Sequence, residues 1–423
     1  MQHHNKYDAL VIGGGPAGSS AATLLAKKGH RVALIEREKF PRYHVGESLI
    51  PYCYFVLDEL GMIEKLNNSS FTKKYSVQFA SSSGKLSQPF YFHEHNDHPS
   101  SKTWQVVRSE FDKMMLENAA ENGVDVFEEM RARKALEENG TVTGIIATDA
   151  EKNEHQFNAT LTVDASGRNG FFAQRNGWRV ADQNLQKISI WTYYEDAVRD
   201  PGIDEGATTV AYLPENGWCW YIPLPDNKVS VGVVADKEYL YRESRDPETI
   251  MNAEIAKNKW LSEHLEPGRV CSEYWVTGDY SYRSKHCAAD GVVLTGDAFA
   301  FLDPVFSTGM LLALHGGSLA ANAADVALKA NDVSAGRFSE YGESVRGSVE
   351  AMRKLVYAFY DTEFNFREFF KKYPDSRNDV TDCLIGRLDR DYDELFRRIS
   401  EFANVPEDLP HGKPLLRPAV VAE

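Results

Sequence analysis

The sequence predicts an α/β protein with a parallel-sheet domain, a second domain that holds an antiparallel sheet, and a helical C-terminal segment. Three patterns support this prediction. A short apolar run at 7–12 precedes a glycine-rich turn, a helix of small residues and a second apolar run at 31–35. Trp218 and Trp220 alternate with other residues as the positions of a strand do. Residues 357–398 combine aromatic and charged side chains, which is typical of packed helices.

Length, charge and cysteine usage exclude several classes of protein. The 423 residues allow two or three domains, at about 100–200 residues each. The 62 acidic residues outnumber the 47 lysines and arginines, which disfavours general binding to nucleic acid or to anionic membranes. The five cysteines are odd in number and widely spaced, and no apolar run reaches the ~18 residues of a membrane-spanning helix. We expect a cytoplasmic enzyme without a signal peptide, a disulfide framework or a stable membrane anchor.

The glycine-rich turn has the spacing of a dinucleotide-binding motif. Gly13, Gly15 and Gly18 form a GxGxxG pattern between the first strand and the helix. In that motif the first glycine permits a tight turn, the second lets the backbone approach a pyrophosphate, and the third allows the helix to pack closely on the strand. The helix N-terminus supplies unpaired N–H groups for the phosphates. Glu36, at the end of the second strand, can accept hydrogen bonds from an adenosine ribose, so the pattern predicts a bound dinucleotide.

Three later segments indicate which dinucleotide binds. Residues 106–112 begin a helix that contains Arg108. Residues 161–168 form a strand followed by a turn of small residues, and residues 292–298 form another strand that leads to Asp297. In this order the segments resemble the FAD-binding signature of the flavoprotein monooxygenase superfamily, which implies a Rossmann-like FAD-binding domain with Asp297 on the ribityl chain. The resemblance also implies that FAD contacts Ala17, Arg37, Ser48 and Gly309.

The chain carries no second GxGxxG unit followed by an acidic residue. This argues against a separate Rossmann site for NADH or NADPH. We therefore expect a two-component system, in which a separate flavin reductase supplies the reduced flavin.

The string Gly-Trp-Cys-Trp-Tyr-Ile-Pro at 217–223 is the most specific in the chain. It resembles the Trp-x-Trp-x-Ile-Pro motif of the flavin-dependent halogenases. The segments at 46–51 and 296–309 resemble the same family. The resemblance spans about residues 7–360 and is closest to the branch of secondary metabolism that acts on phenols and pyrroles, either free or tethered to a carrier protein.

The segment at 71–79 resembles the stretch in which these halogenases carry their catalytic lysine. Alignment of its two flanking phenylalanines places that lysine at Lys74, with Lys73 as the alternative one residue earlier. The resemblance implies that reduced FAD, O₂ and chloride or bromide give hypohalous acid, which then reaches an aromatic substrate. A lysine ammonium can donate hydrogen bonds to hypohalous acid, and a neutral amine could form a haloamine. Without the motif, either lysine would be interpreted as an ordinary surface charge.

The turn before the apolar helix at 310–321 is the expected halide site. Backbone N–H groups at a helix N-terminus bind anions, and this turn contains Ser307, Thr308 and Gly309. The same residues could simply cap the helix. The tryptophans of 217–223 would also fit ordinary sheet packing. The resemblance implies a substrate wall and tunnel formed by Trp218, Trp220, Ile222, Pro304 and Phe306.

Two departures from the family pattern bear on the substrate. The tryptophan-halogenating branch carries a glutamate directly before Ser-Thr-Gly, where this chain has Phe306. An electron-rich phenol or pyrrole needs less help in losing its ring proton, which fits this departure. About 90 residues follow Val333, fewer than in many relatives, so we expect a bulky or partner-delivered substrate.

Other functions stay open at this point. A related flavin-dependent aromatic monooxygenase or hydroxylase would share the FAD motifs, and a flavoprotein similar to the geranylgeranyl reductases would share the Gly-Glu-Ser segment. A non-catalytic flavin-binding protein would keep the fold alone. The tryptophan motif and Lys74 favour the halogenase over all three. Direct oxidation of NADH or NADPH by the purified protein would instead favour a hydroxylase or a reductase.

The run His-Glu-His-Asn-Asp-His at 93–98 contains three histidines, but the surrounding Asn, Asp, Pro and Ser favour a solvated loop over a metal site.

The motifs also divide the chain into domains. The glycine-rich turn and the tryptophan motif fall in different domains, so substrate should bind between them. We expect a discontinuous FAD-binding domain from 1–50, 100–175 and 280–330, a substrate domain from 51–99 and 176–279, and a helical C-terminal region over 331–423.

Overall fold

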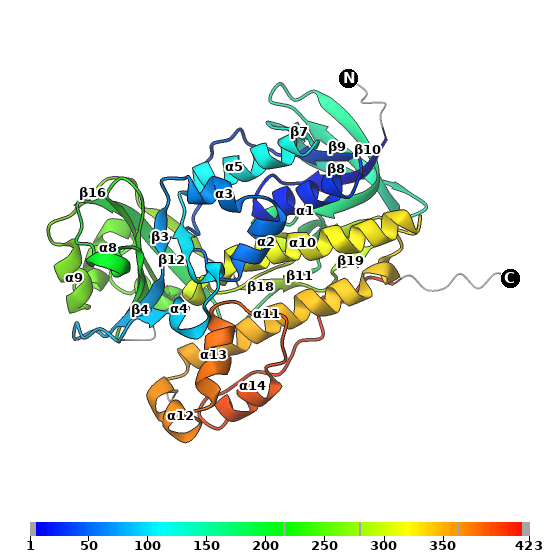
Figure 1. Cartoon of the computed structure of the whole chain (residues 1–423). Coiled ribbons are helices and arrows are strands. Elements are labelled where there is room, and N and C mark those ends of the chain that lie inside the picture. The colour runs from blue at the N-terminus through cyan, green and yellow to red at the C-terminus, as the bar shows by residue number, and fades with distance from the viewer. Residues whose placement is uncertain (1–5, 215–216, 279–280, 363, 417–423) are drawn as a thin grey trace.

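The computed structural model describes residues 6–214, 217–278, 281–362 and 364–416. Two large sheets lie at opposite ends of the molecule, and long helices run beside the N-terminal sheet (Figure 1). This arrangement confirms the expected α/β class with a second, antiparallel sheet. The exact division of the chain into domains stays a prediction.

The first sheet contains the glycine-rich motif. Its central strand β1 (Tyr7–Ile12) pairs in parallel with β10 (Glu154–Asp164) and with β2 (Val32–Ile35). Five of the six β1 residues are buried, because a parallel strand covered by helices has no face in water. The order of the path is β19 (Ala288–Ala289), β20 (Val292–Leu294), β10, β1, β2 and β7 (Asp125–Phe127), and the hairpin of β8 (Arg131–Glu138) and β9 (Thr141–Thr148) extends from β10.

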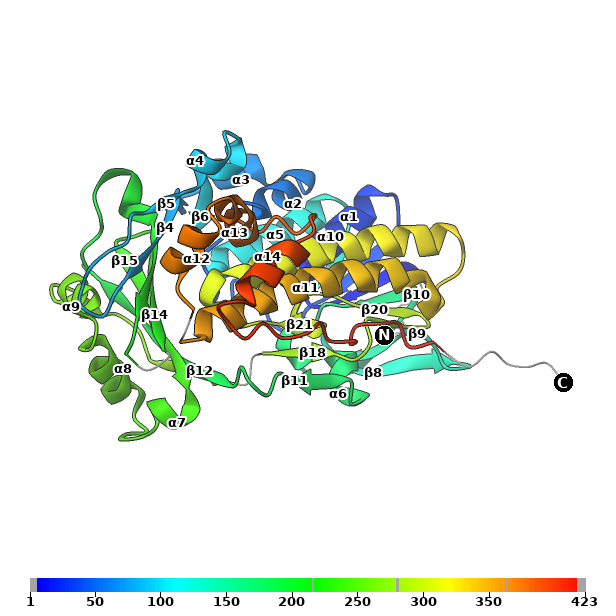
Figure 2. The same ribbon diagram turned by 90° about the horizontal axis from the view of Figure 1, so that it is seen from below.

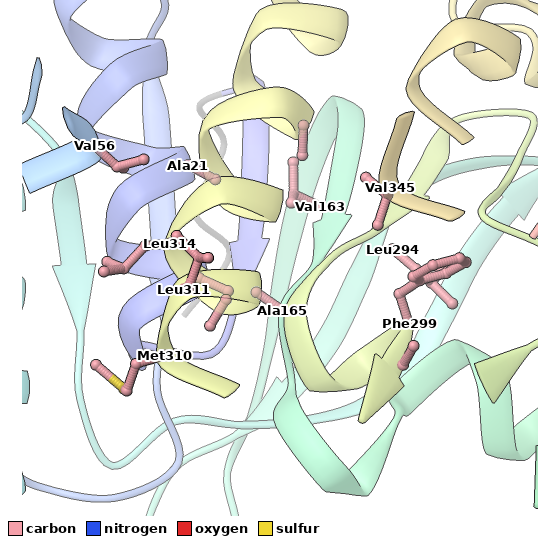
Figure 3. Close-up of a cluster of buried hydrophobic side chains, with 14 of the residues drawn as sticks. Ala21, Val56, Val163, Ala165, Leu294, Phe299, Met310, Leu311, Leu314 and Val345 are labelled. Atoms are coloured by element: carbon pink, nitrogen blue, oxygen red, sulfur yellow. The ribbon is translucent and has the colours of Figure 1, made fainter. Parts of the chain in front are cut away.

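Helices α1 (Pro16–Lys27), α5 (Arg108–Glu121) and α10 (Thr308–Lys329) pack beside this sheet. A Cβ atom on Gly317 would stand 2.4 Å from the carbonyl oxygen of Ala17, so glycine is needed where α10 crosses α1. Figure 3 shows Leu311 and Leu314 of α10 among the apolar side chains of this core. Burial of each such side chain stabilises the fold by about 1.5–3 kcal/mol.

Within the described ranges, α10 is the one helix long and apolar enough to cross a membrane. Its apolar character has a local explanation. The helix packs between α1, α2 (Cys53–Glu59) and α11 (Ser339–Tyr360), and most of its residues are buried there.

The second sheet carries the tryptophan motif on β14 (Trp218–Pro223). Its neighbours β13 (Thr208–Tyr212) and β15 (Lys228–Asp236) both run antiparallel to it. One pair in this sheet, β4 (Ser76–Ala80) with β13, is parallel. The path runs β16 (Arg269–Val270), β12 (Lys187–Glu195), β15, β14, β13, β4 and β5 (Phe90–Tyr91), with β17 (Trp275–Gly278) paired to β12.

The C-terminal segment is helical, as expected. It comprises α11, α12 (Phe366–Lys372), α13 (Ser376–Leu384) and α14 (Asp393–Ile399), which lie together in Figure 2. After α14 the chain returns along the first domain, where the Gly412 N–H donates to the Lys285 carbonyl. The smaller elements are β3 (Thr72–Lys74) with β6 (Thr103–Gln105), β11 (Arg179–Ala181) with β18 (Tyr282–Ser284) and β21 (Ala300–Phe301), and the helices α3 (Ile63–Asn67), α6 (Phe171–Arg175), α7 (Lys237–Leu240), α8 (Pro247–Ile255) and α9 (Lys259–Leu265).

The histidine run at 93–98 differs from the expected loop. Phe92–His95 form a one-turn helix, α4. The Nε2 atom of His95 lies 2.8 Å from Oδ1 of Asp382, and Phe92 is buried. These tertiary contacts hold a turn that local propensity alone would not. Among the described residues, no group of three His, Cys, Asp or Glu side chains is placed to hold a metal.

Gly232 on β15 tests the packing behind the tryptophan motif. A Cβ atom there would lie 2.2 Å from the Trp220 ring, so Gly232→Ala should destabilise the protein by about 1–3 kcal/mol through overpacking. Gly347→Ala, on the exposed side of α11 with no atom within 4 Å, is the matched control and should stabilise the helix by about 0.5–1 kcal/mol. Urea unfolding of the three proteins measures both effects. Equal midpoints for Gly232→Ala and the wild type would contradict the predicted clash.

Candidate active site

A cavity of about 880 Å³ lies between the two large sheets and is lined by residues of both. Part of its wall comes from the glycine-rich turn and Glu36, and part from Trp218 and Trp220 of β14. The first residues of α10 complete it. Segments far apart in the sequence thus line one space, and its size is that of a site for a cofactor or another small molecule.

The glycine-rich turn has the geometry that its spacing predicts. Gly13 has a φ of +106°, a conformation that favours glycine. A Cβ atom on Gly18 would stand 1.9 Å from the Gly13 carbonyl oxygen, so Gly18 permits close packing and lies outside the cavity wall. Gly15 does line the cavity, and a Cβ atom there would meet only the Arg42 side chain, at 3.5 Å. Gly15 therefore leaves the approach to the start of α1 open, and Ala17 lies on the same wall.

The carboxylate of Glu36 is buried and rigidly held. Its Oε2 accepts the Gly14 N–H at 2.7 Å, and its Oε1 accepts the Glu38 N–H at 2.9 Å. Each carboxylate oxygen keeps a further lone pair, so Glu36 can still accept hydrogen bonds from a bound ligand. Arg37 also lines the cavity, with its guanidinium paired to Glu38.

Arg108 is a buried side chain that orders the segment next to it. Its guanidinium binds Asp112 through two bonds of 2.9 and 3.0 Å. Its Nη1 donates to the carbonyls of Val45 and Gly46 at 2.7 and 3.2 Å. Arg108 therefore reaches the cavity and also fixes the backbone that precedes Ser48.

Asp297 follows strand β20 and lines the cavity. Burial raises the pKa of its carboxyl to about 6, although the positive charges of Arg108, Arg168 and Arg179 oppose that rise. A hydroxyl-rich ligand chain bound here could donate hydrogen bonds to this carboxylate.

The turn before α10 presents a helix N-terminus to the cavity. Ser307 has a φ of 55°, and Thr308 begins the helix. The first N–H groups of a helix have no intrahelical partner and carry partial positive charge, so they attract anions. Ser307 and Gly309 line the cavity, whereas the buried Thr308 does not.

The tryptophan motif presents alternate residues to the cavity. Trp218, Trp220 and Ile222 line it, whereas Cys219 and Tyr221 enter a separate apolar cluster on the other face of the sheet. The two indoles are therefore cavity wall as well as core.

Hydrogen bonds and ring contacts fix this wall. The Trp218 Nε1 donates to the Tyr360 hydroxyl at 2.8 Å, and that hydroxyl donates to Asp303 at 2.9 Å. Pro304 lines the cavity beside them. Phe306 does not line it and packs against Phe359 instead, with ring centres 5.6 Å apart.

Lys74 is fully buried at the end of β3. Its Nζ donates to the Ser48 hydroxyl at 2.8 Å and to the Leu49 carbonyl at 3.1 Å. Burial lowers the pKa of Lys74 to about 7, because the charged form loses its hydration. Lys74 itself is not part of the cavity wall, but Ser48 is, so one hydroxyl separates the ammonium from the cavity.

Lys73 lies on the other face of the same strand. Its Nζ donates to the Leu66 carbonyl at 3.2 Å and lies 5.2 Å from the centre of the Trp104 ring. Successive strand residues point to opposite faces, so only one of the two lysines can approach Ser48. The geometry favours Lys74 over Lys73.

Three residues of the cavity wall, and a fourth that is hydrogen-bonded to one of them, had no role in the sequence interpretation. Glu47 was quoted within the Gly-Glu-Ser segment but left unassigned, and Tyr43, Trp191 and Tyr193 belong to no motif. The Tyr193 hydroxyl donates to Oε1 of Glu47. Burial raises the pKa of Glu47 to about 7. The alternation of residues along β12 could have placed Trp191 and Tyr193 on one face, but not beside Glu47.

The depressed pKa of Lys74 has a measurable effect on stability. The unfolded lysine holds its proton up to about pH 10.5 and the folded one releases it near pH 7, so unfolding takes up a proton between these values. Raising the pH opposes that uptake. Relative to Lys74→Met, the wild type should therefore gain stability from pH 7 towards pH 10.5, by at most about 1.4 kcal/mol per pH unit. Urea unfolding of both proteins at several pH values measures this gain, and a constant difference would contradict it.

Comparisons with known proteins agree with the site. The chain matches the family described as Tryptophan halogenase over residues 8–104 and 82–401. It is 31% identical over 398 residues to a 1H-pyrrole-2-carbonyl-[peptidyl-carrier protein] brominase of Pseudoalteromonas luteoviolacea, covering 91% of this chain and 93% of the relative. It is 34% identical over 387 residues to a tryptophan 2-halogenase of Chondromyces crocatus, covering 88% and 71%.

A solved structure gives the same result for the fold. The flavin-dependent brominase Bmp2 superposes with a TM-score of 0.85 at 28% identity, over 94% of this chain and 98% of that one. Sequence match and superposition both extend over nearly the whole chain. The resemblance of the glycine-rich, Gly-Glu-Ser and tryptophan motifs is thereby confirmed, and the chain belongs to the family of flavin-dependent halogenases.

Proposed function

We propose that this enzyme uses reduced FAD, O₂ and chloride or bromide to halogenate an electron-rich aromatic ring, a phenol or a pyrrole. The observation that carries the proposal is the placement of Lys74. Its Nζ is fully buried, has no carboxylate partner at ion-pair distance among the described residues, and is separated from the large cavity by the Ser48 hydroxyl. An ammonium in that position can receive an oxidant that is formed in the cavity and hold it beside the cavity for the aromatic substrate.

The residues of the cavity fit FAD. The open face at Gly15 and the start of α1 would hold the pyrophosphate, Glu36 the adenosine ribose, and Asp297 the ribityl chain. Gly13 and Gly18 shape that turn, and the wall offers further contacts from Ala17, Arg37, Ser48, Arg108 and Gly309. When bound in its reduced form, FAD supplies the oxidising chemistry by reacting with O₂ and transferring oxygen to halide.

The start of α10 is the proposed halide site. The Ser307 N–H already donates to the Pro304 carbonyl at 2.9 Å, so the backbone donors for a halide would be those of Thr308 and Gly309, with the Ser307 side chain beside them. These two N–H groups have fixed directions and carry the positive end of a 22-residue helix. Preorganised donors stabilise an anion without any change in the protein when the halide reacts.

Lys74 would receive the hypohalous acid. Its ammonium form can donate a hydrogen bond to the neutral oxidant, and its neutral form has a free lone pair. With a pKa near 7, both forms are populated at neutral pH. Trp218, Trp220 and Ile222 would keep the substrate away from the cofactor, because their side chains fill the cavity wall beside it.

The substrate assignment rests on position 306. Phe306 packs against Phe359, so no carboxylate stands directly before Ser307 to accept a ring proton. This supports a ring that loses its proton readily, which fits the pyrrole named for one relative better than the tryptophan named for the other. We propose that a carrier protein presents the ring, as the name of the pyrrole brominase indicates for that relative. We also propose that a separate flavin reductase in the cytoplasm supplies the reduced cofactor, because the chain has no second dinucleotide motif.

Lys74→Ala separates halogenation from flavin oxidation. The protein is supplied with FAD, a flavin reductase, NADH, O₂, bromide and catalase, together with monochlorodimedone, phenols and pyrroles as acceptors. Mass spectrometry should find bromine isotope pairs with the wild type and with Lys73→Ala, and none with Lys74→Ala, while reduced flavin is still oxidised. Loss of one acid–base group typically costs about 10²–10⁴ in rate. A product that gains oxygen instead of bromine would identify a hydroxylase.

Gly15→Val tests the cofactor site independently. The two methyl groups would project into the space beside the start of α1, where only the Arg42 side chain lies near. We expect a folded protein, with an unchanged far-ultraviolet circular dichroism spectrum, that is purified without bound flavin. Flavin absorbance equal to that of the wild type would show that the pyrophosphate binds elsewhere.

A further inference from the structure

A chain of hydroxyl groups joins an exposed part of the cavity wall to a buried part. The Tyr193 hydroxyl donates to Oε1 of Glu47, and the Tyr43 hydroxyl lies 3.2 Å from that of Tyr193. Both end residues line the cavity, but Tyr43 is 45% exposed, whereas Glu47 is 3% exposed. Each neighbouring pair of groups is within hydrogen-bond distance.

The direction of these hydrogen bonds is determined by Trp191. An indole N–H can only donate, and Nε1 of Trp191 lies 2.6 Å from the Tyr43 hydroxyl oxygen. That oxygen is therefore an acceptor on this side. The single proton of Tyr193 is given to Glu47, so the proton of Tyr43 must point to Tyr193. Every proton in the chain therefore points from the exposed Tyr43 towards the buried Glu47.

The inner end of the chain is an incompletely bonded carboxyl. The Oε2 atom of Glu47 is buried and has no hydrogen-bond partner among the described residues. The charged and titratable groups that face Glu47 are Tyr193 of β12 and Arg108 of α5, and Asp112 balances the charge of Arg108. Ser230 of β15 also faces it. Burial outweighs these neighbours and favours a protonated carboxyl near neutrality.

We propose that Tyr43, Tyr193 and Glu47 form a proton relay that carries protons from solvent at an exposed part of the cavity wall to the buried carboxyl of Glu47. The inference rests on the proposed function, whose overall reaction, FADH₂ + O₂ + X⁻ + H⁺ → FAD + HOX + H₂O, consumes one proton for each hypohalous acid. Water gives a proton to Tyr43, Tyr43 gives one to Tyr193, and Tyr193 gives one to Oε1 of Glu47. Oε2 of Glu47 releases a proton into the cavity, so no covalent bond other than O–H changes.

Tyrosine-to-phenylalanine variants interrupt the relay while keeping the rings. Tyr193→Phe and Tyr43→Phe should slow the bromide-dependent reoxidation of bound reduced flavin by about 10-fold or more above pH 7, measured by stopped flow. Imidazole buffer, a small acid that can enter from solvent, should restore the rate in proportion to its concentration. A merely structural role would give no such rescue. Tyr194→Phe is the matched control, because Tyr194 neighbours Tyr193 on β12 but points into the apolar cluster on the other face, and it should behave as the wild type.

A second measurement needs no flavin. Infrared difference spectra of the apoprotein on a pH change should show the C=O band of a protonated carboxyl that is absent in Glu47→Gln and shifted in Tyr193→Phe. If the wild type brominates and both relay variants match its rate without imidazole dependence, the relay is wrong and the proposed function stands. If the wild type makes no brominated product, the proposed function fails, and the infrared band alone decides whether Glu47 holds a proton from Tyr193. A spectrum with no Glu47-dependent band overturns the relay.

Discussion

The close contact between α1 and α10 determines where the positive helix ends of the site lie. Gly317 allows α10 to approach Ala17 at a distance that no other residue would permit. Gly309 lies about two turns before Gly317, or about 12 Å along the helix axis. Both N-termini therefore line one cavity at a fixed separation, one beside the glycine-rich turn and one beside the tryptophan wall. The N–H donors at the start of α1 can bind the phosphates of a ligand, and those at the start of α10 can bind an anion near the other end of the same ligand.

Desolvation affects the titratable groups around this cavity in one consistent way. It raises the pKa of Glu47 and of Asp297 and lowers the pKa of Lys74, so that all three pKa values move towards 7. None of them has a close partner of opposite charge at ion-pair distance among the described residues. The charges of these three groups are therefore not fixed by ion pairs, and each group can exchange a proton near neutral pH. This property suits a reaction that turns an anion into a neutral oxidant.

Local sequence patterns were sufficient for four strands of the first sheet, β1, β2, β10 and β20, and for the glycine-rich turn after β1. The strand–turn–helix at 7–27 and the alternation of β14 depend on neighbours in the chain, so their periodicity predicts both structure and exposure. The surroundings of Glu47 could not be predicted, because Tyr193 is far away in sequence, on strand β12 of the second sheet. Phe306 was expected in the tunnel wall, but it packs against Phe359 of a helix whose position no motif specifies. The same limit applies to α4, which depends on a contact with Asp382.

The Gly-Glu-Ser segment connects the proposed proton relay with the proposed catalytic lysine. Backbone bonds from Val106 N–H to the Glu47 carbonyl and from Leu49 N–H to the Trp104 carbonyl hold it in an extended form. In such a segment successive side chains point in opposite directions, so Glu47 meets Tyr193 while Ser48 meets Lys74. A shift of this backbone would alter the proton supply of the cavity and the acceptor of the lysine together. Arg108, which is paired with Asp112, donates to the carbonyls just before Glu47 and thus holds Glu47 and Ser48 in place beside Tyr193 and Lys74.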